Sequence, residues 1–284
     1  MAGFTSALGS ETLSRPAPAA EDKVRGKPEL FADHYSQARL FWISQSPAEQ
    51  AHIVAAYRFE LSRVQTPAIR RRLLAMLANV DPILAAGVAD GLGMDVPPPL
   101  PLASELPMPQ YEPSPGLSLL SRPGQCGIAG RRIAILAAHG VEAAGLQAVY
   151  AELLEAGAVP RLVAPQLGRL KTTDDTPLHA EISIEAGPAV LYDGMIVADG
   201  AASAERLAAD ANALEFVRLQ YRHCKPLLAL GSGAQLLVRA GLPPAPAAAL
   251  WYADAAGTQA ALAAFCQTLA GHRNFDREEQ SPAL

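Results

Sequence analysis

The chain has 284 residues, half of them hydrophobic, and a formal net charge of −5 at pH 7. This length favours one or two domains, and the acidic balance, with a pI near 5.7, gives no electrostatic basis for binding nucleic acid or an anionic membrane. No apolar run is long enough to span a membrane and the N-terminus lacks the pattern of a secretory signal, so we expect a cytoplasmic protein.

Residues 1–30 are rich in Ala, Pro, Ser and charged residues and are predicted to be extended or disordered. Residues 31–94 are predicted to form a compact all-α unit, because three sites place an oxygen-bearing N-cap before a proline. These sites are Ser46-Pro47, Thr66-Pro67 and Asp81-Pro82, and Glu49 completes a capping box with Ser46. The expected buried stripes of the three helices are Ile53, Tyr57, Leu61 and Val64; Ile69, Leu73, Leu77 and Val80; and Leu84, Val88 and Leu92.

A helical unit of this size is marginally stable when it folds alone. Its aromatic residues Phe41, Trp42, Tyr57 and Phe59 present more apolar surface than three short helices can hide. We therefore expect this face to be partly exposed or to dock against another chain.

Residues 95–130 are predicted to form a linker, with nine prolines between positions 97 and 123. The prolines exclude a helix and favour polyproline II, which acts as a semi-rigid spacer. A ligand for an SH3 or WW domain is the alternative reading of such a stretch.

From position 131 to 273 the pattern alternates between strands and helices, and residues 274–284 are predicted to be a tail. Such alternation predicts a doubly wound parallel sheet covered on both faces, so the fold class is α/β with a small helical unit in front. The expected strands are 132–138, 159–165 and about 190–198, then the stretch PLLALGSG (226–233), which turns into a helix, and a short strand near 249–252. The expected helices include one through 146–154, a long one over 203–223, one after Gly233 and a last one over 258–271. A hairpin-like region is expected over 170–184.

The stretch HYSQARLFWISQSPAEQAHIVAAYRFELSRV, residues 34–64, resembles the segment that follows the haem-bearing barrel in catalases. The residues after it resemble the C-terminal part of large-subunit catalases, which carry an extra flavodoxin-like domain, so the resemblance covers about 24–273. By this resemblance the chain begins where the catalytic part has already ended. We therefore expect a truncated or split product of a family that decomposes hydrogen peroxide with haem.

The residues that the family uses for haem chemistry are missing from this sequence. Catalases take their axial tyrosinate from an R-x-x-x-Y motif and their distal groups from a His and an Asn on the barrel. None of the seven Tyr here has an Arg four residues before it; Phe31, Ile53 and Val217 stand at three of these places. We expect no haem, no metal and no catalase activity in this chain alone.

The α/β part also resembles the class I glutamine-amidotransferase-like superfamily, in AAHGVEAAGLQAVYAELLEAG, VLYDGMIVADG and LALGSGAQLLVRAGL. Active members place a Cys on a sharp strand-to-helix turn and a Glu in the first βα turn. Here Gly231 stands at the nucleophile position, Ser232 at the following His position, and Glu142 at the Glu position. A carboxylate without its thiol is no catalytic pair, so a structural remnant is the favoured reading and Glu142 and Ser232 stay weak candidates.

Other residues give weaker signals. His139 is a third weak candidate, because it is expected to line the crevice at the carboxyl ends of the strands. Cys224 beside His223 is read as structural, since adjacent helical residues point in different directions. The three cysteines, with Cys126 and Cys266, are far apart and fit a reducing compartment without disulfides.

Three functions remain open. The first is a structural, stabilising or gating role toward a haem-bearing catalase barrel, or in a homo-oligomer formed through the helical unit. The second is an independent amidotransferase-like domain with peptidase or deglycase activity, and the third is an interaction or chaperone module.

Overall fold

The computed structural model describes residues 29–103, 109–120 and 127–280, which fall into two compact units. The helical unit holds the described residues up to Ile43 and those from Ile53 to Pro113. The α/β unit holds Ser44–His52 and the described residues from Ser114 onward. Most of the predicted disordered segment, and Cys126, lie outside the described residues; Glu29–Ala32 forms a 3-10 turn, which corrects the expectation at the end of that segment.

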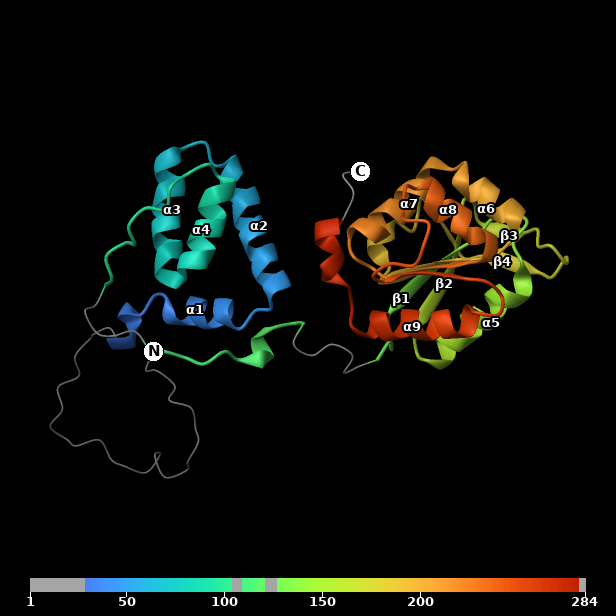
Figure 1. Ribbon diagram of the computed structural model, residues 1–284, viewed down its shortest axis with the longest axis horizontal. Helices are drawn as coiled ribbons and strands as arrows, with labels where there is room; N and C mark the ends of the chain where they lie inside the picture. Colours follow the sequence, from blue (N-terminus) through green and yellow to red (C-terminus); the bar gives the residue numbers. More distant parts are fainter. Residues whose placement is uncertain (1–28, 104–108, 121–126, 281–284) are drawn as a thin grey trace, which may run out of the picture. The chain divides into compact units, whose positions relative to one another are not determined.

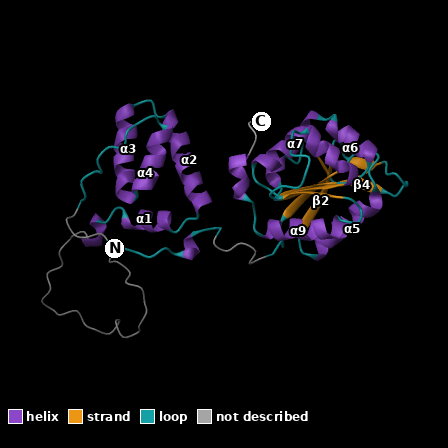
Figure 2. Cartoon of the chain, in the orientation of Figure 1, coloured by secondary structure: helices purple, strands orange, loops and turns teal. Residues whose placement is uncertain are grey.

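The three proline-marked helix starts are confirmed. Described residues of the helical unit form helices and loops without a strand (Figure 2). The helices are α1 (Ser36–Ile43), α2 (Pro47–Arg63), α3 (Pro67–Val80) and α4 (Pro82–Gly91). The residues of α2 up to His52 belong to the α/β unit. Helix α1 was not predicted, although Asp33 marks its start by accepting the Ser36 N–H at 3.0 Å.

The predicted caps hold at two of the three sites. Ser46 and Glu49 form the capping box, since the Ser46 N–H donates to Glu49 Oε2 at 2.8 Å and the Glu49 N–H to Ser46 Oγ at 3.4 Å. Asp81 accepts the N–H groups of Ile83 and Leu84. The prediction is wrong for Thr66, whose side chain makes no capping bond; its carbonyl oxygen accepts the Ile69 N–H instead.

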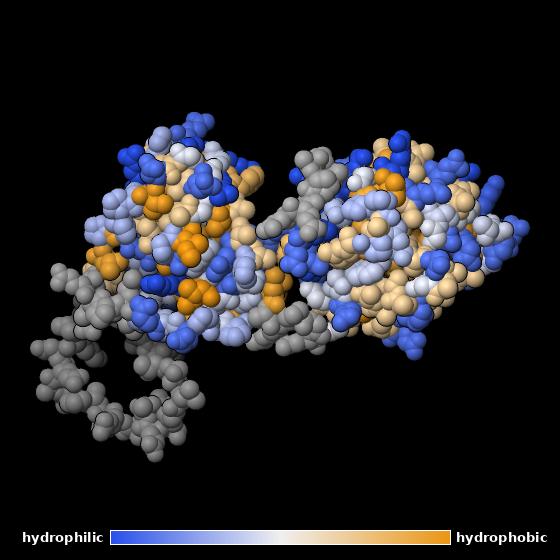
Figure 3. Space-filling model, viewed as in Figure 1, coloured by the Kyte–Doolittle hydropathy of each residue, from blue (hydrophilic) through white to orange (hydrophobic). Residues whose placement is uncertain are grey.

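The core of the helical unit contains most of the predicted stripes, with two corrections. Trp42 is only 4% exposed, because the unpredicted helix α1 carries it into the core. Ile69, in the first turn of α3, is exposed and contributes nothing to the core. Phe41 and Phe59 are exposed as expected, and the Arg63 guanidinium lies 4.0 Å from the Phe59 ring centroid. Hydrophobic residues are visible over the surface of this unit (Figure 3).

The linker region is only partly described. Residues 104–108 and 121–126 lie outside the described residues. Before the first gap, residues 95–103 are irregular, and hydrogen bonds from Asn79 Nδ2 to the Leu100 carbonyl and from the Leu100 N–H to the Ala75 carbonyl attach them to α3. After it, Pro115–Leu117 forms a 3-10 turn, so the prolines do not exclude all helical structure.

The α/β unit contains a six-stranded parallel sheet in the order β5-β2-β1-β6-β7-β8. Its strands are β1 (Arg132–Leu136), β2 (Val159–Ala164), β5 (Ile182–Ser183), β6 (Gly194–Val197), β7 (Leu227–Leu230) and β8 (Leu250–Ala253). The predicted hairpin is the antiparallel pair β3 (Gly168–Leu170) and β4 (Leu178–Ala180). The third long strand begins at Gly194 and not near 190, because Ala189–Leu191 is a 3-10 turn.

Helices cover both faces of this sheet (Figure 1). On one face lie α6 (Ala201–Ala208), α7 (Ala211–Arg222) and α8 (Ala234–Arg239); on the other lie α5 (Ala143–Glu155) and α9 (Thr258–Ala270). Alternate residues of β1 enter the two cores, Ala134 and Leu136 on the α7 side and Ile133 and Ile135 on the α5 side. The expected long helix over 203–223 is wrong: Asp210 breaks it by accepting the Asn212 and Ala213 N–H groups as the N-cap of α7.

The predicted tail is part of the α/β unit as far as it is described. Phe275–Gln280 forms a 3-10 helix, and Arg277 within it is completely buried. Its guanidinium donates to the carbonyl oxygens of Ala248, Ala249 and Lys225 at 2.8–3.3 Å. These bonds connect the end of the chain to the starts of β7 and β8.

Candidate functional site

A cavity of about 570 Å³ lies at the carboxyl ends of β1, β6 and β7, between α5 and α9. Glu142, Asp199 and Gly231 line it, together with apolar residues of the two helices that include Leu146 and Leu262. The structure therefore brings Glu142 and Gly231 together, as the amidotransferase resemblance implies. Open α/β sheets bind ligands at this edge.

Glu142 is the N-cap of α5 and not a residue of its first turn. Its Oε2 accepts the Gly145 N–H at 3.0 Å, and its own N–H donates to the Asp199 carbonyl at 2.9 Å. The carboxylate thus satisfies an end of the helix, where a negative charge is favourable.

Gly231 forms the sharp turn between β7 and the short helical segment that follows. Its φ of +49° lies in the left-handed region, which glycine adopts without steric cost. A Cβ at this position would overlap the Asp199 carboxylate. Asp199 therefore occupies the space that a nucleophilic side chain at position 231 would need.

Asp199 follows β6 and is held by three donors. Its Oδ1 accepts the Gly200 N–H at 2.6 Å, the Ser232 N–H at 2.8 Å and the Ser232 hydroxyl at 2.5 Å. Burial opposes ionisation, but the bonds from the Ser232 hydroxyl and the two N–H groups lower the pKa of Asp199 below its usual value. The sequence interpretation missed this residue, although an acid directly after a buried apolar strand was a usable signal.

Ser232 is held in a structural role. Its hydroxyl donates to the Asp199 carboxylate, and its Oγ lies 3.3 Å from the Gly200 N–H. Among the described residues no His is hydrogen-bonded to it, and the Asp199 carboxylate that accepts its proton is a weak base because its pKa is lowered.

His139 lines a separate cavity of about 330 Å³ with Gln166, Arg206 and Asp210. The expectation that it lies at the carboxyl ends of the strands agrees with this position. It does not meet Glu142 or Ser232 in one cavity.

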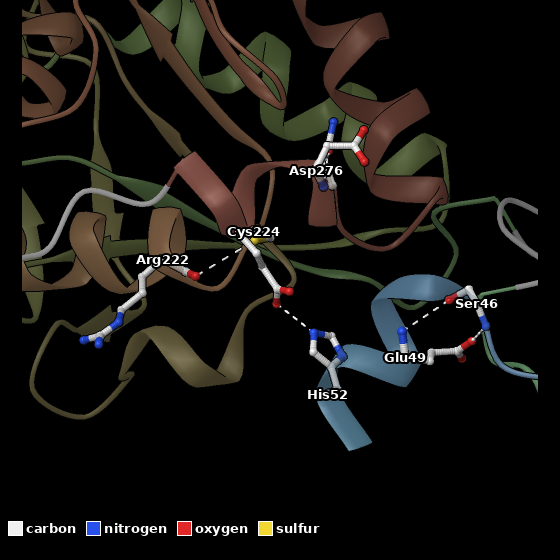
Figure 4. A network of polar contacts seen from close by, with 8 residues as sticks. Ser46, Glu49, His52, Arg222, Cys224 and Asp276 are labelled. Atoms are coloured by element: carbon white, nitrogen blue, oxygen red, sulfur yellow. Dashed lines mark hydrogen bonds and ion pairs between the residues drawn. The ribbon is translucent and has the colours of Figure 1, made fainter. Parts of the chain in front are cut away.

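Cys224 is buried, and burial raises the pKa of its thiol. Its Sγ lies 3.9 Å from the Arg222 carbonyl oxygen (Figure 4). Burial likewise raises the pKa of the Cys266 thiol to about 11. Both thiols have the environment of structural and not reactive cysteines.

Glu49 does more than complete the cap of α2, and no pattern in the sequence indicated this. Its carboxylate accepts the Ser46 N–H (Figure 4), and also the Ser118 hydroxyl at 2.7 Å and the N–H groups of Leu119 at 2.8 Å and Leu120 at 3.2 Å. Burial opposes its ionisation, but these hydrogen bonds lower its pKa to about 2. All of these residues belong to the α/β unit.

A third cavity of the α/β unit, about 420 Å³, is lined by His52, Arg222, Arg273 and Glu278, among other residues. His52 Nε2 lies 2.7 Å from Glu278 Oε1, and both side chains are exposed, so the pair contributes little stability.

The described residues contain no group of three or more His, Cys, Asp or Glu side chains placed to hold a metal ion. Within the same residues, no helix combines the length and apolar character needed to cross a membrane.

Two families match the chain. The family described as catalase-related immune-responsive matches residues 28–92, and the one described as the C-terminal domain found in long catalases matches residues 129–279.

Individual relatives align across both units. Catalase HPII of Pseudomonas putida is 39% identical over 268 residues, which cover 92% of this chain and 36% of the relative. Catalase C of Rhizobium meliloti is 39% identical over 227 residues, 80% of this chain and 32% of its own length. Catalase HPII of Mycobacterium avium is 43% identical over 216 residues, which cover 75% of this chain and 30% of the relative. The chain thus spans about a third of the length of these relatives.

Proposed function

The chain belongs to the family of C-terminal domains found in long catalases, and on that premise we propose that it is a non-catalytic part of such an enzyme that docks on a haem-bearing catalase barrel. The observation that carries the proposal is that both units align, in one continuous match, with a single catalase. The role is structural: the chain stabilises the barrel that decomposes hydrogen peroxide, and it acts in the same compartment, the cytoplasm.

The surface of the helical unit supports docking. Phe31, Phe59 and Ile83 are 58%, 57% and 73% exposed, so an interface on this unit would cover large apolar side chains. Burying such side chains at an interface is favourable by about 25 cal/mol for each Å² removed from water.

In this proposal no tyrosine of the chain serves as a haem ligand. All seven Tyr lie within the described residues, and none lines any of the three cavities described above. Tyr192 and Tyr221 are 1% and 2% exposed inside the α/β core, where no cofactor has room to approach their oxygen atoms. The peroxide chemistry is therefore assigned to the barrel.

The α/β unit supports no amidotransferase-like chemistry in this proposal. Gly231 has no side chain to act as a nucleophile, and Asp199 fills the adjoining space. Glu142 is used as a helix cap.

Association with a barrel tests the proposal directly. The partner is the part of Pseudomonas putida catalase HPII outside the aligned 36%, produced as a separate chain. We expect the two chains to co-elute in size-exclusion chromatography, and peroxide decomposition by the complex to survive heating better than that of the partner alone. The Phe59→Asp variant should weaken the complex.

Leu154→Asp is the matched control, because Leu154 is an apolar residue with a similar exposure, 49%, on the α/β unit. Separate elution, or equal loss of binding in the Phe59 and Leu154 variants, contradicts docking through the helical unit. A Soret band or oxygen release from the purified chain contradicts the assignment of peroxide chemistry to the barrel.

A further inference from the structure

The cavity that contains His139 lies at the carboxyl ends of β1 and β2, next to the point where the strand order of the sheet reverses. From β1 the chain goes to β2 on one side and later returns to β6 on the other side of β1. Ala138 and His139 follow β1, and Pro165 and Gln166 follow β2. Arg206 and Asp210 come from the α6–α7 segment that follows β6. Ligands of open α/β sheets bind at this carboxyl edge.

The polar groups of this cavity are mainly hydrogen-bond donors. The Lys171 N–H donates to His139 Nδ1 at 3.0 Å, so the proton of the neutral ring is on Nε2. His139 Nε2 lies 3.0 Å from the Gln166 amide. The amide atom at that distance is Gln166 Nε2, and two donors do not bond to each other; we therefore assign the flipped amide, with its oxygen on His139 Nε2 and its NH₂ available to another acceptor.

Arg206 adds a positive charge to the same wall. Its guanidinium makes no hydrogen bond or ion pair with the described residues, and it is exposed at the last turn of α6. A guanidinium binds carboxylate and phosphate oxygens through paired hydrogen bonds.

The acid in the cavity uses one of its oxygen atoms as a helix cap. Asp210 Oδ1 accepts the Asn212 N–H at 2.8 Å and the Ala213 N–H at 3.4 Å, as the cap of α7. The remaining lining is apolar: Ala138, Pro165, Leu170 and Ala209. A volume of about 330 Å³ suits a small molecule.

We propose that this cavity binds a small organic oxyanion, with its carboxylate or phosphate group on Arg206 and the His139–Gln166 pair and its apolar body against Leu170 and Pro165. The site does not overlap the Glu142–Asp199 cavity, and the proposal does not depend on docking to a barrel.

Titration of the full chain tests this site. The probes are acetate, benzoate, inorganic phosphate and phenyl phosphate at constant ionic strength, and the signal is the His139 imidazole resonance, assigned with the His139→Gln variant. Arg206→Gln should raise the Kd on the order of tenfold or more, because one charged hydrogen-bond partner is lost. Arg239→Gln is the matched control: it removes the same charge from an exposed position in the last turn of α8, outside the cavity.

The site is supported if the His139 resonance shifts saturably in the wild type and in Arg239→Gln, and if the Kd is higher in Arg206→Gln. Tighter binding of benzoate and phenyl phosphate than of acetate and inorganic phosphate supports the apolar contacts, and the stronger of the two aromatic probes identifies the group. Absence of a saturable shift, or equal weakening in the two arginine variants, overturns the proposal.

Discussion

Lys225 is a buried cation without a carboxylate partner in the described residues, and its charge costs stability at neutral pH. It is 4% exposed, and its Nζ donates to the carbonyl oxygens of Ala189 at 2.9 Å and Tyr192 at 2.5 Å. Burial, with a smaller contribution from Arg273, lowers its pKa from 10.5 to about 8. Between these two pH values the unfolded chain binds a proton that the folded chain has released. The free energy of unfolding therefore rises with pH.

The size of this effect follows from the two pKa values. At about 1.4 kcal/mol for each pH unit, the full contribution is about 3 kcal/mol, and most of it develops between pH 7 and pH 10. The variant Lys225→Met has no such group. We expect the wild type to gain about 2–3 kcal/mol relative to this variant when pH is raised from 7 to 10. The Tyr252 and Cys266 groups, whose pKa values burial raises to about 12 and about 11, are common to both proteins and cancel.

Urea unfolding at the two pH values measures this difference. The chain has two Trp residues, so a Trp42→Phe background leaves Trp251 of β8 as a fluorescent reporter of the α/β unit. Lys171→Met is the matched control, because Lys171 is exposed in the same unit. The reasoning is refuted if the difference in the free energy of unfolding between the wild type and Lys225→Met stays constant with pH. It is also refuted if Lys171→Met shows the same pH-dependent difference.

Three other perturbations test single contacts, each read as the change in the free energy of unfolding. Glu49→Gln should lower the free energy of unfolding by about 1–2 kcal/mol near neutral pH, after allowance for solvent screening. Because the pKa of Glu49 is lowered to about 2, this loss should shrink as pH falls from 4.5 and should vanish near pH 2. A loss that does not depend on pH contradicts this. Gly231→Ala should lower the free energy of unfolding by about 2 kcal/mol or more. The loss should be smaller in an Asp199→Gly background, because the overlap between the new Cβ and the Asp199 carboxylate is then removed. If the losses of the two substitutions simply add in the double variant, this overlap is not the cause. Asp81→Ala should cost about 1 kcal/mol and Thr66→Ala clearly less, because only Asp81 caps its helix; equal costs would be inconsistent with the geometry.

The elements with local signals could be predicted from the sequence. Pro47, Pro67 and Pro82 begin helices where expected, and the apolar run of β1 is a buried strand. Local signals also explain the errors. The run from Ser203 to His223 has continuous helical character. Asp210 nevertheless ends one helix and caps the next, because an aspartate is more favourable at an N-cap than inside a helix. Trp42 is buried because of α1, whose short pattern was not recognised.

The candidate site was predictable only in part, because its decisive contacts join residues far apart in sequence. Glu142 and Gly231 line one cavity, but Asp199 reaches Ser232 across 33 positions, and no periodicity or spacing reports such a contact. The same holds for Lys225, which donates to carbonyl oxygens 33 and 36 residues away. Burial of a charged group therefore became visible only with the fold.

The Asp199–Ser232 pair explains how the strand-to-helix turn keeps its shape without a nucleophile. In an enzyme this strained geometry serves to present a reactive side chain, and its cost is accepted for catalysis. Here glycine at position 231 removes most of that cost, and the carboxylate fixes the next residue through both its N–H and its hydroxyl. These contacts therefore stabilise the turn without a catalytic side chain. Its shape alone, in this chain or a relative, is no argument for activity unless position 231 carries a side chain and position 199 leaves room for it.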